Sequence, residues 1–200
     1  MKQLALVIDL NVCVGCHACV TSCKEWNTSG TAGFMADEDP FGKDPKGTFF
    51  NRVQTFEVGR FPDTETVHFP KSCLHCEDPP CVPVCPTGAS YKRESDGIVL
   101  VDSDKCIGCN YCSWACPYGA PQFNEATGIM TKCDLCLDYV EQGRQPACVA
   151  ACQMRVLQFG EIDELRTIPG TMHEVFPLPD ANLTEPAGVL TPHKNTQRTF

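Results

Sequence analysis

The sequence predicts an α+β fold of two nested, cysteine-rich modules with long loops and an extended C-terminal tail. First, the 200-residue chain contains sixteen cysteines that form four groups of four, with none left over. Second, short strand-like runs bounded by turn residues lie between the groups. Third, an internal repeat uses the same unit twice in the middle of the chain. The groups are Cys13, Cys16, Cys19 and Cys23; Cys73, Cys76, Cys81 and Cys85; Cys106, Cys109, Cys112 and Cys116; and Cys133, Cys136, Cys148 and Cys152.

The spacing within the groups indicates iron-sulfur chemistry. Groups one and three read C-x2-C-x2-C-x3-C, and Pro117 follows group three, which is the run that holds 4Fe-4S clusters in bacterial ferredoxins. Group four departs from it by the long gap between Cys136 and Cys148 and by Gln153 in the place of proline, and group one has Lys24 there. We expect four 4Fe-4S clusters in two bacterial-ferredoxin-like modules.

The ferredoxin run also predicts that ligands are exchanged between groups. Its first three cysteines bind one cluster and its fourth binds the other. The expected ligand sets are Cys13, Cys16 and Cys19 with Cys152; Cys133, Cys136 and Cys148 with Cys23; Cys73, Cys76 and Cys81 with Cys116; and Cys106, Cys109 and Cys112 with Cys85. This pairing predicts a continuous inner module at residues 71–116 and a discontinuous outer module at residues 1–26 plus 117–170.

The repeat predicts a hairpin between cysteine groups. One copy leads from Cys85-Pro-Thr-Gly-Ala to Cys106, and the next leads from Cys116-Pro-Tyr-Gly-Ala to Cys133. In the first copy, residues 89–93 and 98–102 are strand-like and flank the turn residues Ser95-Asp96-Gly97. Small residues in the cysteine loops, such as Gly15 and Gly108, are expected to let backbone N–H groups approach the sulfurs.

The remaining elements follow from local patterns. The N-terminus is expected to be a strand, as are residues 51–58 and 64–69, and short helices are expected at 134–141 and 161–168. Residues 27–70 form a loop and strand insertion, in which the Gly- and Pro-rich stretch 27–50 is either disordered or packed on a partner. The proline-rich tail, residues 171–200, is expected to extend over a neighbouring subunit and bind it.

Charge and hydropathy exclude several classes of protein. The formal net charge is −9, and thiolate ligands would make it more negative, so nucleic acid is not an expected partner. The sequence contains no run of about 18 consecutive apolar residues, which is the length needed to span a membrane. The N-terminal apolar run is too short for a signal peptide, which favours a cytoplasmic location. Export to the periplasmic face with a partner that carries a twin-arginine signal is the alternative.

Two other uses of the cysteines compete with clusters. Zinc sites with four thiolates use C-x2-C pairs, whereas this chain has triplets. A disulfide scaffold requires an oxidising compartment, which the sequence does not indicate. His17 and His75 lie inside cysteine loops and are expected to tune clusters rather than bind them. Trp114, Tyr111 and Tyr118 are expected to pack around a cluster.

Longer motifs carry a resemblance to a known family. These are Val7-Ile-Asp-Leu-Asn-Val-Cys13-Val-Gly-Cys16, Cys73-Leu-His-Cys76-Glu-Asp-Pro-Pro-Cys81, Cys106-Ile-Gly-Cys109 and Phe159-Gly-Glu-Ile-Asp-Glu-Leu-Arg. Over residues 4–170 the chain resembles the four-cluster iron-sulfur subunit of complex iron-sulfur molybdoenzymes, of the dimethyl sulfoxide reductase type. The resemblance implies two partners: a catalytic subunit with a molybdenum bis-pterin cofactor, and an integral membrane anchor that exchanges electrons with quinone.

The resemblance also implies a function without catalysis by this chain. Its role would be to relay single electrons between the two partners. The segments Cys19-Val-Thr-Ser-Cys23-Lys-Glu-Trp and Cys112-Ser-Trp-Ala-Cys116 look like the iron-sulfur subunit of membrane-bound sulfite dehydrogenases. The same role in a dimethyl sulfoxide or polysulfide reductase is one alternative, and a free-standing polyferredoxin is another.

Overall fold

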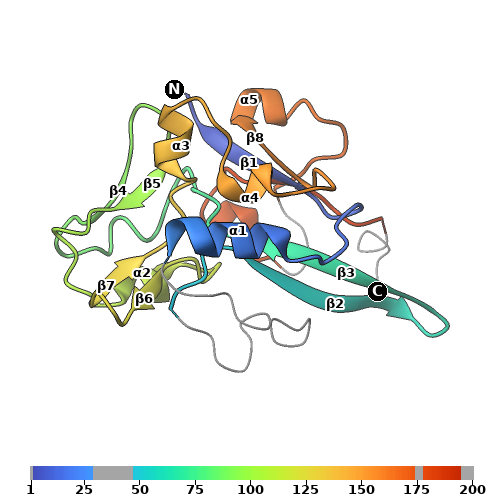
Figure 1. The fold of residues 1–200 in the computed structure, drawn as a ribbon, viewed down its shortest axis with the longest axis horizontal. Helices are drawn as coiled ribbons and strands as arrows, with labels where there is room; N and C mark the ends of the chain where they lie inside the picture. The colour runs from blue at the N-terminus through green and yellow to red at the C-terminus, as the bar shows by residue number, and fades with distance from the viewer. Residues whose placement is uncertain (1, 29–46, 174–177, 195–200) are drawn as a thin grey trace.

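The fold is taken from a computed structural model that describes residues 2–28, 47–173 and 178–194. Figure 1 shows several small sheets and short helices gathered around α1, with one long hairpin projecting to the side. The strands are β1 (Leu4–Asp9), β2 (Arg52–Arg60), β3 (Asp63–Lys71), β4 (Ser90–Lys92), β5 (Val99–Val101), β6 (Gln122–Asn124), β7 (Ile129–Thr131), β8 (Leu157–Glu161) and β9 (Val189–Thr191). The helices are α1 (Ala18–Asn27), α2 (Tyr111–Ala115), α3 (Leu137–Glu141), α4 (Ala147–Ala150), α5 (Ile162–Leu165) and the 3-10 helix η1 (Ala181–Leu183).

The expected N-terminal strand is the centre of a three-stranded sheet. β1 pairs antiparallel with β8 and parallel with β9, in the order β8-β1-β9. One face of β1, with Leu4, Leu6 and Ile8, packs into the main core that also contains cysteines, and the other face packs against α5. Because both faces are buried, the strand is apolar throughout rather than alternating. This sheet joins the two ends of the chain.

The two ends of the chain also meet through helices. α1 begins just after Cys13 and Cys16, and α4 lies between Cys136 and Cys152. The hydroxyl of Ser22 on α1 donates to the carbonyl oxygen of Ala147 on α4 at 3.2 Å. The helices carry three buried cysteines, Cys19 and Cys23 on α1 and Cys148 on α4. The contact therefore brings groups one and four together.

Three hairpins complete the described structure. β4 pairs with β5 around the predicted turn, which confirms the hairpin of the first repeat copy, and β6 pairs with β7 in the second copy. The predicted strands at 51–58 and 64–69 are β2 and β3, which extend further toward each other than expected. Figure 1 shows β2–β3 projecting away from the two small hairpins, which lie at the opposite side of the molecule.

Two predicted helices are shorter than expected. α3 begins only at Leu137, because Leu135 and Cys136 have left-handed backbone conformations that a helix cannot contain. α5 covers only Ile162–Leu165 of the predicted stretch 161–168. None of the helices in the described residues is long and apolar enough to cross a membrane.

The tail differs from the expected extended arm. Residues 178–194 pack on the chain itself, since β9 joins the central sheet and Ala187, Val189 and Leu190 are buried. The pairing of β9 with β1 could not be predicted from the sequence of the tail, because its many prolines argue against a strand and β9 has only three residues. Most of the predicted loop 27–50 lies outside the described residues, but Phe49 and Phe50 at its end are buried in the main core.

Candidate metal centres

The fold gathers the sixteen cysteines into four thiol sets, which we name A to D. In set A, burial raises the pKa of Cys19, and the nearby thiols of Cys13, Cys152 and Cys16 raise it further. In set B, the thiols of Cys23 and Cys136 add to the rise that burial causes in the pKa of Cys148. The thiols of Cys23 and Cys148 likewise add to the rise in the pKa of Cys133. Sets C and D each line a cavity. Set C is Cys73, Cys76, Cys81 and Cys116, and set D is Cys85, Cys106, Cys109 and Cys112.

These sets have the membership that the ferredoxin rule predicts. Each combines three cysteines of one group with the remote cysteine of another, as Cys152 with the first group in set A. The described residues include all sixteen cysteines. That each set binds a cluster through all four thiols stays a prediction, because the structure describes the chain alone.

The four cysteine loops share one backbone feature. The residue directly before the second cysteine of each group's leading C-x2-C pair has a positive φ: Gly15 at 65°, His75 at 45°, Gly108 at 69° and Leu135 at 59°. This left-handed residue turns the loop so that it curls around its thiols. Glycine is the residue best suited to the position, and only two of the four loops have it. At Gly15 the backbone N–H bonds to the thiol of Cys13, as the small residue was expected to allow.

At Gly108 the requirement for glycine is steric as well as conformational, which gives a prediction. A Cβ at Gly108 would lie 2.3 Å from the backbone oxygen of Gly128. The positive φ of Gly108 is in addition a conformation that residues with a side chain rarely adopt. We expect Gly108→Ala to destabilise the protein by about 1–3 kcal/mol and to lower the occupancy of set D. The matched control is Gly88→Ala, since Gly88 has a φ of 66° near set D but no neighbour within 4 Å.

Iron and acid-labile sulfide content and electron paramagnetic resonance spectra of both variants measure the effect. The Gly108 variant should lose one cluster signal that the Gly88 variant keeps. Equal occupancy in the two variants would contradict the close approach of the Cys106–Cys109 loop to Gly128.

Hydrogen bonds converge on the sulfurs in every set. Backbone N–H groups donate to Cys152 in set A from Val156 at 3.2 Å, to Cys136 in set B from Ala147 at 3.4 Å, and to Cys106 in set D from Met130 at 3.3 Å. Set C also has a charged side-chain donor, Lys132, with Nζ 3.7 Å from the sulfur of Cys73. Such donors stabilise thiolates and tune the potential of a cluster, so the sets suit iron-sulfur ligation.

Buried polar atoms give a further test of whether a cluster fits. The backbone N–H of Val99 donates to Nδ1 of His75 at 3.0 Å, which assigns the ring proton to Nε2. His75 is buried in the Cys73–Cys76 loop, and Nε2 has no hydrogen-bond partner among the described residues. Burial, and then the charge of Lys132, lower the pKa of His75, so the ring is neutral. A cluster sulfide in set C is an acceptor that would satisfy this donor.

Burial makes the free thiols hard to ionise. It raises the pKa of Cys19, Cys23 and Cys76 to about 12, and neighbouring thiols add to the rise. Iron supplies the positive charge that stabilises thiolates at such positions, so these three thiols need a metal to deprotonate near neutral pH. Binding then releases protons.

The alternatives to clusters fit the geometry poorly. All sixteen cysteines are free, so the disulfide scaffold is wrong for this structure. Within the described part of the chain, no three His, Cys, Asp or Glu side chains lie close enough to hold a single metal ion. Zinc would need four thiolates about 2.3 Å from one ion. Sets of thiols around a wider space suit a four-iron cluster.

The aromatic side chains near set D differ from the expectation. Trp114 is 77% exposed and Tyr111 is exposed beside it, with 5.6 Å between ring centroids. Only Tyr118 packs in the interior, where its hydroxyl bonds to that of Thr184 at 2.8 Å. Sequence reasoning also missed Lys132, because a charged residue beside a cysteine gives no signal of burial.

Comparison with known proteins matches this geometry. Residues 64–162 match a family described as "4Fe-4S dicluster domain", and residues 12–89 match a second family with the same description. A sulfite dehydrogenase subunit of Allochromatium vinosum is 66% identical in an alignment of 170 positions that covers 82% of this chain and 71% of the relative. A component of the anaerobic dimethyl sulfoxide reductase of Escherichia coli is 43% identical in an alignment of 205 positions that covers 98% of this chain and 92% of the relative.

Two dicluster domains and sixteen cysteines account for four 4Fe-4S clusters. Similarity at this level extends along nearly the whole chain, well beyond the cysteine groups. The chain therefore belongs to the iron-sulfur electron-transfer subunits of the dimethyl sulfoxide reductase type.

Proposed function

We propose that the chain relays single electrons between a catalytic subunit with a molybdenum bis-pterin cofactor and a membrane anchor subunit that exchanges electrons with quinone. Each thiol set would hold a 4Fe-4S cluster, which supplies a one-electron redox centre. The chain itself is non-catalytic in this proposal, and its residues hold the clusters in position and tune their potentials. The two nested ferredoxin-like modules, 71–116 inside 1–26 plus 117–170, are the unit that does so.

The observation that carries the proposal is the proximity of successive sets. Burial is the largest cause that raises the pKa of Cys148, Cys133 and Cys112, and a nearby thiol of the next set adds to each rise. This thiol is Cys19 of set A for Cys148 of set B, Cys73 of set C for Cys133 of set B, and Cys81 of set C for Cys112 of set D. This proximity supports a row in the order A, B, C, D, along which electrons would pass.

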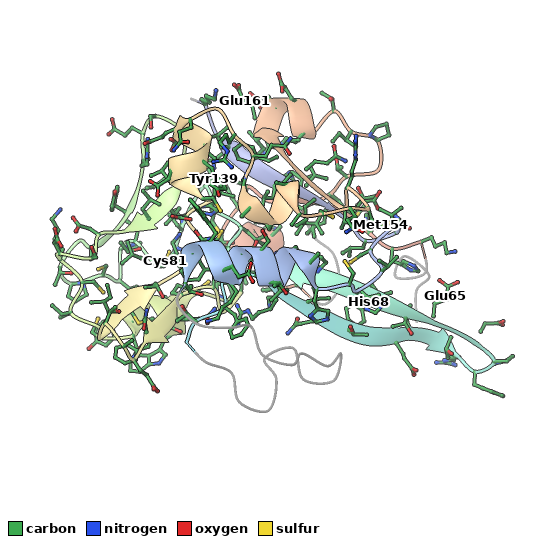
Figure 2. All side chains as sticks on the ribbon, in the orientation of Figure 1. Glu65, His68, Cys81, Tyr139, Met154 and Glu161 are labelled. Atoms are coloured by element: carbon green, nitrogen blue, oxygen red, sulfur yellow. The ribbon has the colours of Figure 1, made fainter. Side chains whose placement is uncertain are left out.

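Burial of the sulfurs differs between the ends and the middle of the row. All thiols of set B are buried, as are three of the four in set C, whereas Cys16 in set A is exposed and only Cys112 of set D is buried. A row of thiol sets that is buried in the middle and partly exposed at its ends suits the transfer of electrons from one partner subunit to the other. In Figure 2, Met154, which follows Cys152 of set A, and Cys81 of set C lie toward opposite ends of α1.

Exposed apolar side chains lie at both ends of the row and support docking of two partners. Val14 is 57% exposed in the first loop of set A, and Met154 is exposed just after Cys152. Ile107 is 65% exposed in the loop of set D, and Trp114 of the same cysteine group is exposed as well. These apolar side chains beside the end sets are thus left for other subunits to cover. A free-standing polyferredoxin is the alternative, and it would have no use for two such surfaces.

For the reaction of the complex, we propose sulfite oxidation. The support is the identity of 66% with a subunit named for sulfite dehydrogenase, against 43% with one named for dimethyl sulfoxide reductase. A dimethyl sulfoxide or polysulfide reductase is the competing assignment. We place the chain at the membrane through its anchor partner, on the cytoplasmic face, with the periplasmic face as the alternative.

Purification of the native complex in mild detergent tests the proposal. We expect mass spectrometry to detect this chain with a molybdenum-containing subunit and an integral membrane subunit, and we expect sulfite to reduce the clusters of the complex. Clusters that stay oxidised with sulfite but, once reduced, are reoxidised by dimethyl sulfoxide would favour the reductase. A stable monomer that never co-elutes with a molybdenum protein would contradict the relay between subunits.

A further inference from the structure

A buried lysine lies where sets B and C meet. Lys132 follows β7, directly precedes Cys133 of set B, and is only 5% exposed. Its Nζ donates to the carbonyl oxygens of Val99 and Cys133, the latter at 2.9 Å, and lies 3.7 Å from the sulfur of Cys73 in set C. The ammonium group is thus held by three acceptors from separate parts of the chain.

The surroundings of Lys132 lack the negative charge that a buried cation requires. It forms no ion pair with a carboxylate in the parts of the chain that the structure describes. Buried charges in proteins are normally paired with an opposite charge or a metal site. A thiolate-bound cluster at set C would supply that negative charge.

Set C is the cluster that this charge acts on. Lys132 donates to Cys73, and it lines the same cavity as the four thiols of the set. Arg52 and Lys71 lie near Cys116, the remote member, and add positive charge on another side. A fixed cation stabilises the reduced cluster more than the oxidised one, because reduction adds an electron and so a negative charge.

We propose that Lys132 tunes the set-C cluster, raising its reduction potential by donating a charged hydrogen bond to Cys73. The inference rests on the proposed relay and adds to it a residue that sets the energy of one step. The oxidised cluster takes up one electron from a neighbouring cluster, and no proton is transferred. The fixed ammonium makes set C a more favourable position for the electron than it would be without that charge.

The chain supplies a matched control for the test. Lys105 stands directly before Cys106 as Lys132 stands before Cys133, but its side chain is 62% exposed and pairs with Asp102 at 2.8 Å. Potentiometric titration of the purified complex, followed by electron paramagnetic resonance, measures each cluster. We expect Lys132→Met to lower the reduction equilibrium constant of one cluster at least about tenfold, which is a downward shift of about 59 mV. Lys105→Met should leave all four potentials in place, and Lys132→Arg should restore most of the loss.

The outcomes separate this inference from the relay itself. Four assembled clusters with unchanged potentials in Lys132→Met would overturn the tuning role and leave the relay intact. A wild-type chain without four 4Fe-4S clusters would instead remove the proposed function. If the Met variant fails to assemble, hyperfine spectroscopy of the wild-type complex labelled with 15N-lysine decides: coupling of a lysine nitrogen to a reduced cluster supports the hydrogen bond, and its absence overturns it.

Discussion

Replacing Cys152 by alanine is expected to damage the cluster at the N-terminal end of the chain, not the one held by its sequence neighbours. Cys152 lies with Cys13 and Cys19 in set A, so its loss leaves that cluster with three thiolates. An iron corner without a ligand is exposed to loss, so the set-A signal should disappear or change to a three-iron form. Cys23→Ala should act in the same way on set B, whose other members lie near the C-terminus.

Two reference variants make this exchange visible. Cys13→Ala marks the spectrum of a protein that lacks cluster A, and Cys148→Ala marks one that lacks cluster B. The spectrum of Cys152→Ala should match that of Cys13→Ala, and the spectrum of Cys23→Ala should match that of Cys148→Ala. The opposite matching would mean that each group binds its own cluster, and would exclude nested modules with exchanged ligands.

Removing iron from the protein is expected to unfold most of the chain. Cys19, Cys23, Cys73, Cys133 and Cys148 belong to the main hydrophobic core, so the clusters are part of the interior. The small sheets are only two or three strands wide and do not form a stable core alone. We expect chelation under oxidising conditions to abolish most far-ultraviolet circular dichroism at 25 °C. An apo chain with native dichroism and cooperative melting would contradict this.

Any structure that survives in the apo chain should weaken at high pH. In unfolded chains a thiol has a pKa of about 8.5. Burial raises the pKa of Cys19 and Cys23 to about 12 in the folded chain. The unfolded state therefore loses its thiol protons first, so stability that is present below this lower pKa is lost as the pH rises toward the higher one. Denaturant titrations of the apo chain across this range measure the loss, and a gain in stability would contradict the burial of neutral thiols.

Local signals allowed much of the fold to be predicted. The β4–β5 hairpin follows from Gly97 and the strand-like runs on either side, and the membership of the thiol sets follows from cysteine spacing. What could not be predicted depends on contacts between distant residues. The strand β9 forms because its residues pair with β1. The helix α3 begins only at Leu137, because the loop that contains Cys136 needs a left-handed backbone that a helix cannot have. Tertiary context decides such cases.

Lys132 shows the limit of the sequence most clearly. It and Lys105 occupy the same position before a cysteine group, yet one is buried between two thiol sets and the other is exposed. The difference arises from the surrounding fold, which places Val99 and Cys73 around Lys132. Asp102 and Asp104 before Lys105 indicate an exposed ion pair, whereas nothing in the residues next to Lys132 indicates its contact with Cys73.

The proposed relay requires that the sixteen cysteines hold four clusters in one row, A to D, with ligands exchanged between groups. Anomalous diffraction at the iron edge from crystals of the native complex would locate these clusters. We expect four separate iron clusters in this chain, each held by one thiol set, with the clusters of sets A and D at the ends of the row. Fewer than four clusters, zinc at any set, or Cys23 and Cys152 each bound with its own sequence group would contradict it.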